Sequence, residues 1–377
     1  MGPLLAHYCM LALGLWIGVQ LPESAIYGMV YAPLHSDNVL IDGLLRWDAH
    51  LYVRIAVEGY EAKSVAFFPV LPMLMRALVA VGFDVKAAGL LVTNVSYMAV
   101  FWLLDAWLAG QEWRKPQRQT ILWAFAVVPT SFFFNSIYSE AIFLALALGV
   151  AVACQKGRFW LLGLLLILAS LTRNIGFFLA LIPLSHFLQE YLDGRKVANW
   201  RWRNAYLCLL APFVALALLA VFQYVSFGSP FAFVEAQGKY WDRTFSLPWQ
   251  GYIANLRFIK YRWPLVAPGI VLDSLMVTVA ALAWLALAVQ LWRKRDSATK
   301  WMNMAYLVLA AIWLIVPLLS TVPYAPIISN ARYCLVQFPL LPVAVLLPRF
   351  WRLVLGIISA GLMVWAVAGF SSWQWVG

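Results

Sequence analysis

Residues 268–292 read PGIVLDSLMVTVAALAWLALAVQLW, an apolar run whose only acidic residue is Asp273. A helix of about 20 such residues spans the roughly 30 Å hydrocarbon core of a lipid bilayer. Comparable apolar runs lie at residues 4–20, 87–109, 205–227 and 353–370. The sequence therefore predicts an all-α, polytopic membrane protein.

The overall composition indicates the same class. Of the 377 residues, 64% are hydrophobic and 11% are charged, whereas a soluble domain has about 45–50% apolar and about 25% charged residues. The four cysteines all fall in apolar runs without metal-site spacing, so buried structural thiols are expected. The first run lacks a basic leader and a cleavage pattern, which favours a retained helix over a removed signal peptide.

The net charge of +11 would suggest nucleic-acid binding in a soluble protein, but its placement along the chain indicates membrane topology instead. Five short segments carry all of it, at residues 110–119, 155–158, 189–204, 293–300 and 349–352. The positive-inside rule places these segments in the cytoplasm. The bilayer is thus an expected partner and nucleic acid is not.

Loops on one side of a membrane are separated by an even number of crossings. With the five basic loops inside, this parity predicts about 11 transmembrane helices and a cytoplasmic N-terminus. The count requires residues 66–82, which are apolar but short and contain two prolines, to form a juxtamembrane or re-entrant helix outside. The chain is then one membrane-embedded domain, residues 1–377, with large outer loops at residues 22–83 and 228–267.

The first outer loop contains the densest group of polar residues, DGLLRWDAHLYVRIAVEGY at residues 42–60, followed shortly by AFFPVLP. If residues 47–57 are helical, Asp48 and Tyr52 lie on one face. A carboxylate beside His50 and between aromatic side chains can serve as a general base. The alternative is a set of solvated loop charges with aromatic residues at the membrane interface.

These residues resemble the RWD, GY and AFFP motifs of the PIG-V family, the second mannosyltransferases of GPI-anchor synthesis, and of its prokaryotic relatives. Later motifs resemble that family in the same order: IYSE at 137–140, TRNIG at 172–176, QGKYWDR at 237–243 and ARYCLVQFP at 331–339. The resemblance covers roughly residues 40–345. Each motif is short, but the ordered set is specific.

The resemblance implies a GT-C fold, a multi-helix membrane body that carries outer juxtamembrane helices. It also implies a glycosyltransferase that moves a hexose, with mannose expected, from a polyprenyl-phosphate donor to a lipid, glycolipid or other acceptor. The expected location is the cytoplasmic membrane of a prokaryote, with the active site facing outside. No cofactor is implied. His35 and His50 lie near Asp residues without the spacing of a metal motif, and a divalent metal is left open.

GT-C enzymes typically carry an acidic residue in the first outer loop, and Asp48 is the position that matches. The chain departs from these families at the residue after Asp48, where many have Glu, and at Leu51 and Tyr52, where the PIG-V pattern often has His-Phe. Asp48 is the expected catalytic base, with the carboxylates of Asp42 and Glu58 in reserve. One base suffices for inversion, in which the acceptor hydroxyl attacks the anomeric carbon directly.

A donor phosphate requires cations, and the candidates are Arg173, Arg332, Lys239 and Arg243. The first two lie at the outer ends of apolar helices, where an unpartnered charge is costly. Two alternatives remain. Arg173 could pair with Glu140 inside the helix bundle, and the cations of the second outer loop could reach toward lipid headgroups.

Substrate contacts are expected from the same motifs, at Arg46, His50, Tyr52, Tyr138, Glu140, Asn174, Gln237, Trp241 and Tyr333. Two structural alternatives apply here as well. Glu140 could favour a helix N-terminus that Ser139 caps, and the aromatic residues could form an interfacial belt.

Two other classes of function compete with a transferase. A lipid or glycolipid transporter or flippase would show inverted repeats or charged, broken helices at mid-membrane, whereas the acidic residues of this chain gather in an outer loop. A non-catalytic membrane scaffold is the third class.

Overall fold

The computed structural model describes residues 1–23, 38–192, 200–263, 267–293 and 300–376, so His35 and part of the first outer loop lie outside the described residues. The N-terminal half contains α1 (Gly2–Val19), α3 (Val39–Asp42), α4 (Asp48–Glu58), η1 (Ser64–Ala66), α5 (Val70–Ala80), α6 (Val85–Gly110), α7 (Lys115–Ala126), η2 (Ser131–Phe134), α8 (Glu140–Gln155), α9 (Phe159–Ser170), η3 (Asn174–Ala180) and α10 (Leu181–Leu192). The C-terminal half contains α11 (Trp200–Phe227), α12 (Ala232–Trp241), β1 (Thr244–Phe245), α13 (Pro248–Arg262), α14 (Pro268–Arg293), α15 (Lys300–Leu318), β2 (Ser320–Thr321), α16 (Asn330–Tyr333), η4 (Cys334–Val336), η5 (Phe338–Val345) and α17 (Arg349–Ser371).

Five helices among the described residues are long and apolar enough to span a membrane. They are Gly2–Val19, Val85–Gly110, Cys208–Phe227, Pro268–Arg293 and Arg349–Ser371. These coincide with the five apolar runs of the sequence, so the predicted all-α membrane class is confirmed. Phe213, Leu282 and Ile357 on these helices are 68%, 60% and 65% exposed, and an extensive outward apolar surface belongs in lipid. The chain is a multi-pass membrane protein.

Shorter apolar helices complete the bundle, at Val70–Ala80, Glu140–Gln155, Phe159–Ser170, Asn174–Gln189 and Asn303–Leu318. Helix α5 has 11 residues, which gives a length of about 17 Å at 1.5 Å per residue. That is about half of the hydrocarbon thickness, so its length suits a juxtamembrane helix. The predicted number of 11 crossings stays a prediction.

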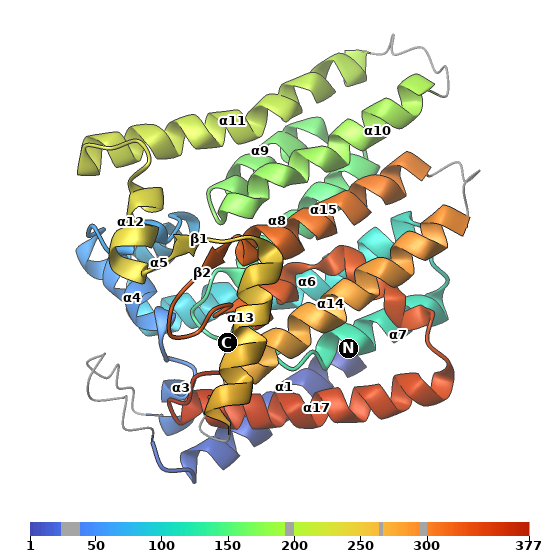
Figure 1. Cartoon of the computed structure of the whole chain (residues 1–377). Helices are drawn as coiled ribbons and strands as arrows, with labels where there is room; N and C mark the ends of the chain where they lie inside the picture. Colours follow the sequence, from blue (N-terminus) through green and yellow to red (C-terminus); the bar gives the residue numbers. More distant parts are fainter. Residues whose placement is uncertain (24–37, 193–199, 264–266, 294–299, 377) are drawn as a thin grey trace.

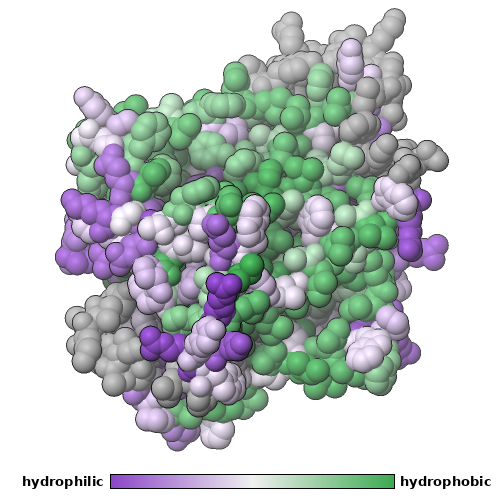
Figure 2. Space-filling model, in the orientation of Figure 1, coloured by the Kyte–Doolittle hydropathy of each residue, from purple (hydrophilic) through white to green (hydrophobic). Residues whose placement is uncertain are grey.

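The long helices lie side by side with similar axis directions, from α11 at one side of the molecule to α1 and α17 at the other (Figure 1). The short helices α4, α5 and α12 gather at one end of this bundle, and α13 runs across it. The ends of α10, α11, α14 and α15 that flank residues 193–199 and 294–299 lie at the opposite end. Figure 2 shows apolar surface over the helices and hydrophilic residues mainly toward the two ends.

Packing within the bundle fixes the start of α8, where the IYSE motif lies. Helix α8 packs on α6 and α9, and the turn η2 just before it buries Phe132, Phe133 and Phe134 completely. A close-packed aromatic turn of this kind has little freedom to move. The next residues, up to Glu140, therefore sit on a rigid support.

Candidate active site

Asp48 is the first residue of α4, which confirms the predicted helix to within one residue at each end. Trp47 before it has a φ of 55°, a conformation that costs a bulky residue about 1–3 kcal/mol. Tyr138 holds this turn, because the backbone N–H of Asp48 donates to its hydroxyl oxygen at 3.2 Å and the hydroxyl donates to the carbonyl of Arg46 at 3.2 Å. The strained turn thus fixes Asp48 next to Tyr138, just before α8.

Asp48 is one of four charged side chains in contact. Its Oδ2 is 2.6 Å from Nη1 of Arg332, and Nε of Arg332 is 3.2 Å from Oε1 of Glu140. The same Glu140 oxygen accepts a hydrogen bond from Nη1 of Arg173 at 2.6 Å. We call these four residues the charged cluster. Its carboxylates and guanidiniums alternate, and their formal charges cancel.

The members of the charged cluster come from four separate elements. Asp48 begins α4 and Glu140 begins α8, while Arg173 directly precedes η3 and Arg332 lies in α16. In the TRNIG motif, a Cβ on Gly176 would lie 2.4 Å from the carbonyl oxygen of Ala169. Only glycine allows η3 to pack this closely on α9, and this packing sets the position of Arg173.

Side-chain exposure separates the two carboxylates. The Asp48 side chain is 16% exposed, whereas that of Glu140 is 2% exposed, and Oε2 of Glu140 has no hydrogen-bond partner. The Asp48 carboxylate is therefore more open to solvent than that of Glu140, which contacts both Arg173 and Arg332. The pairing of Arg173 with Glu140, an alternative left open by the sequence, is present. Ser139 occupies the N-cap position of α8, but its side chain makes no capping hydrogen bond.

Burial and the neighbouring charges set the protonation of the side chains around the cluster. Burial raises the pKa of Tyr52, and the nearby Glu140 carboxylate raises it further. Burial likewise raises the pKa of Tyr138 well above its ordinary value, with Asp48 adding to the effect. Burial alone would lower the pKa of Arg332, but Asp48 and Glu140 raise it well above the ordinary value. At neutral pH both tyrosines are hydrogen-bond donors and Arg332 is charged.

Tyr333 lies among the arginines. Its ring centroid is 5.1 Å from Cζ of Arg173 and 5.5 Å from Cζ of Arg332, distances typical of cation–π contacts. Burial alone would raise the pKa of Tyr333, but Arg243, Arg332 and Arg173 lower it below the ordinary value. The predicted donor-binding arginines therefore surround one phenol, with Arg243 approaching from the second outer loop.

An aromatic wall joins the first outer loop to the second. Tyr52 and Phe67 meet edge to face at 5.1 Å between ring centroids, and Phe67 meets Trp241 of α12 at 5.6 Å. The indole N–H of Trp241 donates to the carbonyl of Lys63 at 3.2 Å. The AFFP and QGKYWDR motifs therefore lie side by side next to α4.

A two-residue strand pair connects the second outer loop to the segment that leads to α16. Thr244 pairs with Thr321 and Phe245 with Ser320, antiparallel. Nη1 of Arg243 donates to Oγ of Ser320 at 3.1 Å. The position of Arg243 is thereby tied to the chain that carries Arg332.

Two predicted substrate contacts, Arg46 and His50, lie near the C-terminal end of α17, and their contact with substrate stays a prediction. Nε of Arg46 donates to the carbonyl of Ser371 at 3.0 Å, and its guanidinium lies 4.8 Å from the Trp373 ring. Nε2 of His50 lies 3.2 Å from the carbonyl oxygen of Leu45. In the RWD motif, Arg46 thus anchors the turn that places the Asp48 carboxylate next to Arg332.

Three other predicted residues lie at the margin of the site. Lys239 is exposed, with its ammonium 5.3 Å from the Tyr240 ring. The backbone carbonyl of Gln237 accepts from the N–H of Arg243 at 3.0 Å, and Asn174 is an exposed first residue of η3. Their predicted contacts with substrate stay predictions.

The two reserve carboxylates of the first outer loop, Glu58 and Asp42, lie in other settings. Glu58 forms a surface pair with Arg54 at 2.8 Å, and Asp42 ends α3. Within the described part of the chain, no three His, Cys, Asp or Glu side chains gather as a metal site would require.

Asp273 belongs to the site although the sequence analysis gave it no role. It lies in α14, is 1% exposed, and its Oδ1 accepts a hydrogen bond from the backbone N–H of Ala331 at 2.7 Å. Ser329, just before α16, has a φ of 69°, so this carboxylate holds a strained turn next to Arg332. A single acid in an apolar helix is itself a signal of function.

We expect Asp273→Ala to lower the free energy of unfolding by about 1–3 kcal/mol, because the buried N–H of Ala331 loses its acceptor. The matched control is Asp105→Ala, since Asp105 also lies in a long apolar helix but pairs with Arg118 at 3.2 Å and is 38% exposed. The control should change stability by at most about 1 kcal/mol. Thermal unfolding of the purified proteins in detergent measures the stability of both variants. Equal loss of stability in the two would show that Asp273 does not hold the turn before Arg332.

The fold and the site together define a polytopic membrane protein with a charged cluster at the end of its helix bundle where the short helices α4, α5 and α12 gather. The family model described as Mannosyltransferase (PIG-V) matches residues 34–240, more than half of the chain. The chain belongs to this family, which confirms the resemblance seen in its motifs.

Individual relatives agree with this assignment. The chain is 29% identical over 228 residues to GPI alpha-1,6-mannosyltransferase 2 of Mus musculus, a match covering 53% of this chain and 45% of the mouse protein. It is 32% identical over 152 residues to the protein of that name in Rattus norvegicus, covering 37% of this chain and 30% of the rat protein. The matched region spans less than half of either relative. Among solved structures, the chain is similar to the apo oligosaccharyltransferase of Archaeoglobus fulgidus, with a TM-score of 0.46, 11% identity, and coverage of 98% of this chain and 56% of that one.

Proposed function

We propose that the protein is a glycosyltransferase that moves a hexose, with mannose the expected sugar, from a polyprenyl-phosphate donor to a hydroxyl group of a lipid, glycolipid or other acceptor. Membership of the mannosyltransferase family supports the reaction class. The observation that carries the proposal is the charged cluster, in which a partly exposed carboxylate lies 2.6 Å from an arginine that a second, buried carboxylate holds.

In the proposed reaction Asp48 removes the proton of the acceptor hydroxyl as its oxygen attacks the anomeric carbon. The bond between that carbon and the phosphate oxygen breaks, and the polyprenyl phosphate leaves with the electron pair. Arg332 and Arg173 stabilise the leaving phosphate, because fixed guanidiniums bind phosphate oxygens through charge-assisted hydrogen bonds.

The arrangement favours a single, inverting displacement. Double displacement requires a second carboxylate as nucleophile, but Glu140 is 2% exposed and contacts two guanidiniums. The aromatic wall of Tyr52, Phe67 and Trp241 offers ring faces and edges on which a sugar can pack. The configuration at the anomeric carbon of the product should therefore be opposite to that of the donor.

The proposal includes a GT-C fold with about 11 crossings, as the charge pattern of the sequence predicts. It places the charged cluster at the non-cytoplasmic face of a prokaryotic cytoplasmic membrane. The helix ends that flank the basic segments lie at the end of the bundle opposite α4 and α12 (Figure 1). Since basic segments favour the cytoplasmic side, this arrangement supports the proposed orientation.

Two variants, each with one added cysteine, test the orientation. Ala62, an exposed residue in the first outer loop, should react as Ala62→Cys with a membrane-impermeant maleimide added to intact cells. Arg114, at the start of α7, should react as Arg114→Cys only after the membrane is permeabilised. The unsubstituted chain gives the background from its own four cysteines. The reverse labelling pattern would place the site inside.

The function itself is tested by incubating purified protein with a native lipid extract and either polyprenyl-phosphate-mannose or GDP-mannose, followed by mass spectrometry of the lipids. We expect a hexosylated product from the lipid-linked donor alone. Transfer from GDP-mannose without a lipid carrier would contradict the mechanism. Redistribution of the donor across the bilayer without a covalent product would favour a flippase.

A further inference from the structure

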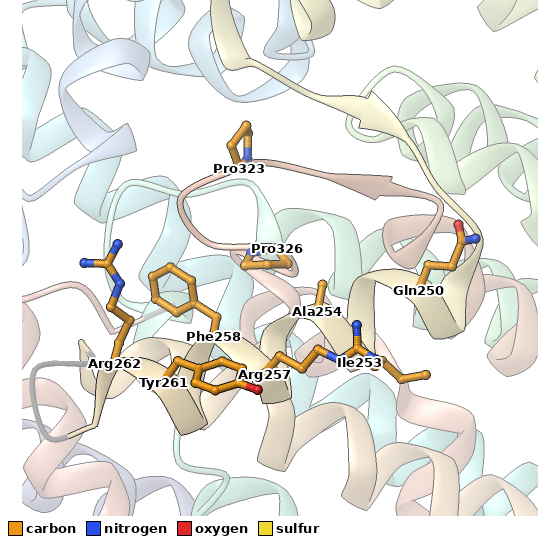
Figure 3. Close-up of a pocket in the computed structure, with 9 residues that line it drawn as sticks. All are labelled: Gln250, Ile253, Ala254, Arg257, Phe258, Tyr261, Arg262, Pro323 and Pro326. Carbon is orange, nitrogen blue, oxygen red and sulfur yellow. The ribbon is translucent and has the colours of Figure 1, made fainter.

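A groove of about 670 Å³ lies between α13 and the segment that joins β2 to α16. It is lined by Gln250, Ile253, Ala254, Arg257, Phe258, Tyr261, Arg262, Pro323 and Pro326 (Figure 3). These residues come from α13 and from the segment between β2 and α16. None of them belongs to the charged cluster, so the mechanism above does not use this groove.

The groove is cationic over an apolar floor. Two of its nine lining residues are arginines and none is acidic, and α13 contains no acidic residue at all. Figure 3 shows the guanidinium of Arg262 on the side of Phe258 and that of Arg257 on the side of Ile253. The Arg262 guanidinium lies 5.9 Å from the Phe258 ring centroid. An occupant should therefore combine negative charge with apolar surface.

The surroundings of the groove are those of a membrane interface. Helix α13 runs across the bundle of apolar helices (Figure 1), and hydrophilic residues lie over it between apolar areas (Figure 2). Trp249, Tyr261 and Trp263, at the two ends of the helix, are 60%, 76% and 69% exposed. Exposed aromatic and basic side chains on one helix are typical of a helix that lies in the headgroup layer.

The segment that forms the far wall of the groove continues along the chain to Arg332. Val322 and Ala325 are buried in a cluster against which Phe258 and Ile259 of α13 pack. Pro323 and Pro326 face the groove in the same segment, and Arg332 follows a few residues later. A molecule bound between α13 and this segment would contact the chain that positions Arg332.

We propose that the groove binds the headgroup of an anionic phospholipid, with Arg257 and Arg262 supplying the positive charge that attracts its phosphate from the two sides of the groove and the apolar floor taking its glycerol portion. The occupant is a lipid rather than a free anion, because a free phosphate would leave the apolar floor and the exposed aromatic residues without a role. This site goes beyond the proposed transfer reaction and does not depend on it.

The test uses the full chain purified in detergent and measures bound lipid by native mass spectrometry during titration with dioleoylphosphatidylglycerol. Three single variants are compared, Arg257→Ala, Arg262→Ala and Lys260→Ala. Each removes one positive charge from α13, but Lys260 does not line the groove. We expect the apparent dissociation constant to rise about fivefold for each arginine removed, and by less than about twofold for the lysine.

Two further experiments distinguish a bound anionic lipid from a bound free anion. Dioleoylphosphatidylcholine should bind more weakly than the anionic lipid, and inorganic phosphate should not displace the bound lipid. Displacement by inorganic phosphate would show a free-anion site and overturn the proposal. Equal loss in the lysine and arginine variants, or no loss in any, would also overturn it. Thermal unfolding without added lipid confirms that each variant is folded.

Discussion

Asp48→Asn is expected to slow hexose transfer by about 10²- to 10⁴-fold, the usual contribution of a general base. Asparagine has nearly the same shape and can still accept a hydrogen bond from Arg332, so the site should stay assembled. It cannot accept the proton of the acceptor hydroxyl. The measurement is the initial rate of transfer from polyprenyl-phosphate-mannose by protein reconstituted in liposomes.

The matched control for Asp48→Asn is Glu58→Gln at the other end of α4. Glu58 is 60% exposed and pairs with Arg54 at the surface, so its transfer rate should stay within about twofold of wild type. A rate for Asp48→Asn close to that of the control would remove Asp48 from the mechanism. Full loss in both variants would indicate a general effect on α4.

Arg332→Lys is expected to slow transfer by at least about 10²-fold, as removal of one fixed donor to a developing charge does in other enzymes. The guanidinium of Arg332 contacts Asp48 through Nη1 and Glu140 through Nε. Lysine presents a single ammonium and cannot reproduce this two-sided geometry. Since the side chain is proposed to hold the donor phosphate, the KM for the donor should rise.

Arg54→Lys is the matched control for Arg332→Lys. Arg54 also pairs with two carboxylates, Glu58 and Glu61, but it is 55% exposed. Exposed pairs contribute at most about 1 kcal/mol, so this variant should transfer hexose nearly as fast as wild type. An unchanged KM in Arg332→Lys would argue that Arg332 supports the structure without touching the donor.

The sequence predicted the parts of the protein that depend on local pattern. Apolar runs of sufficient length determine membrane helices, so all five long spans were found. The helix that carries Asp48 was also predicted. Asp48 and Tyr52 are four positions apart, which places both side chains on one face of a helix. The family motifs supplied the members of the charged cluster.

Roles that depend on distant contacts could not be predicted in the same way. Asp48 and Arg332 are 284 positions apart, and no local pattern shows that Glu140 lies next to both arginines. The contact of Arg46 with the end of α17, 325 positions away, was likewise not visible in the sequence, and its expected contact with substrate stays a prediction. Asp273 was given no role because its partner, the N–H of Ala331, is a backbone group that any sequence provides.

The proposed mechanism makes Asp48 the base and has Arg173 and Arg332 bind the donor phosphate. Its most direct test is the equilibrium binding of polyprenyl-phosphate-mannose to the Asp48→Asn and Arg332→Lys proteins, measured side by side with wild type. Asp48→Asn should bind the donor at least as tightly as wild type, because one negative charge beside Arg332 is gone, and Arg332→Lys should bind it about tenfold more weakly or worse. Loss of donor binding in Asp48→Asn, or wild-type binding in Arg332→Lys, would contradict the account.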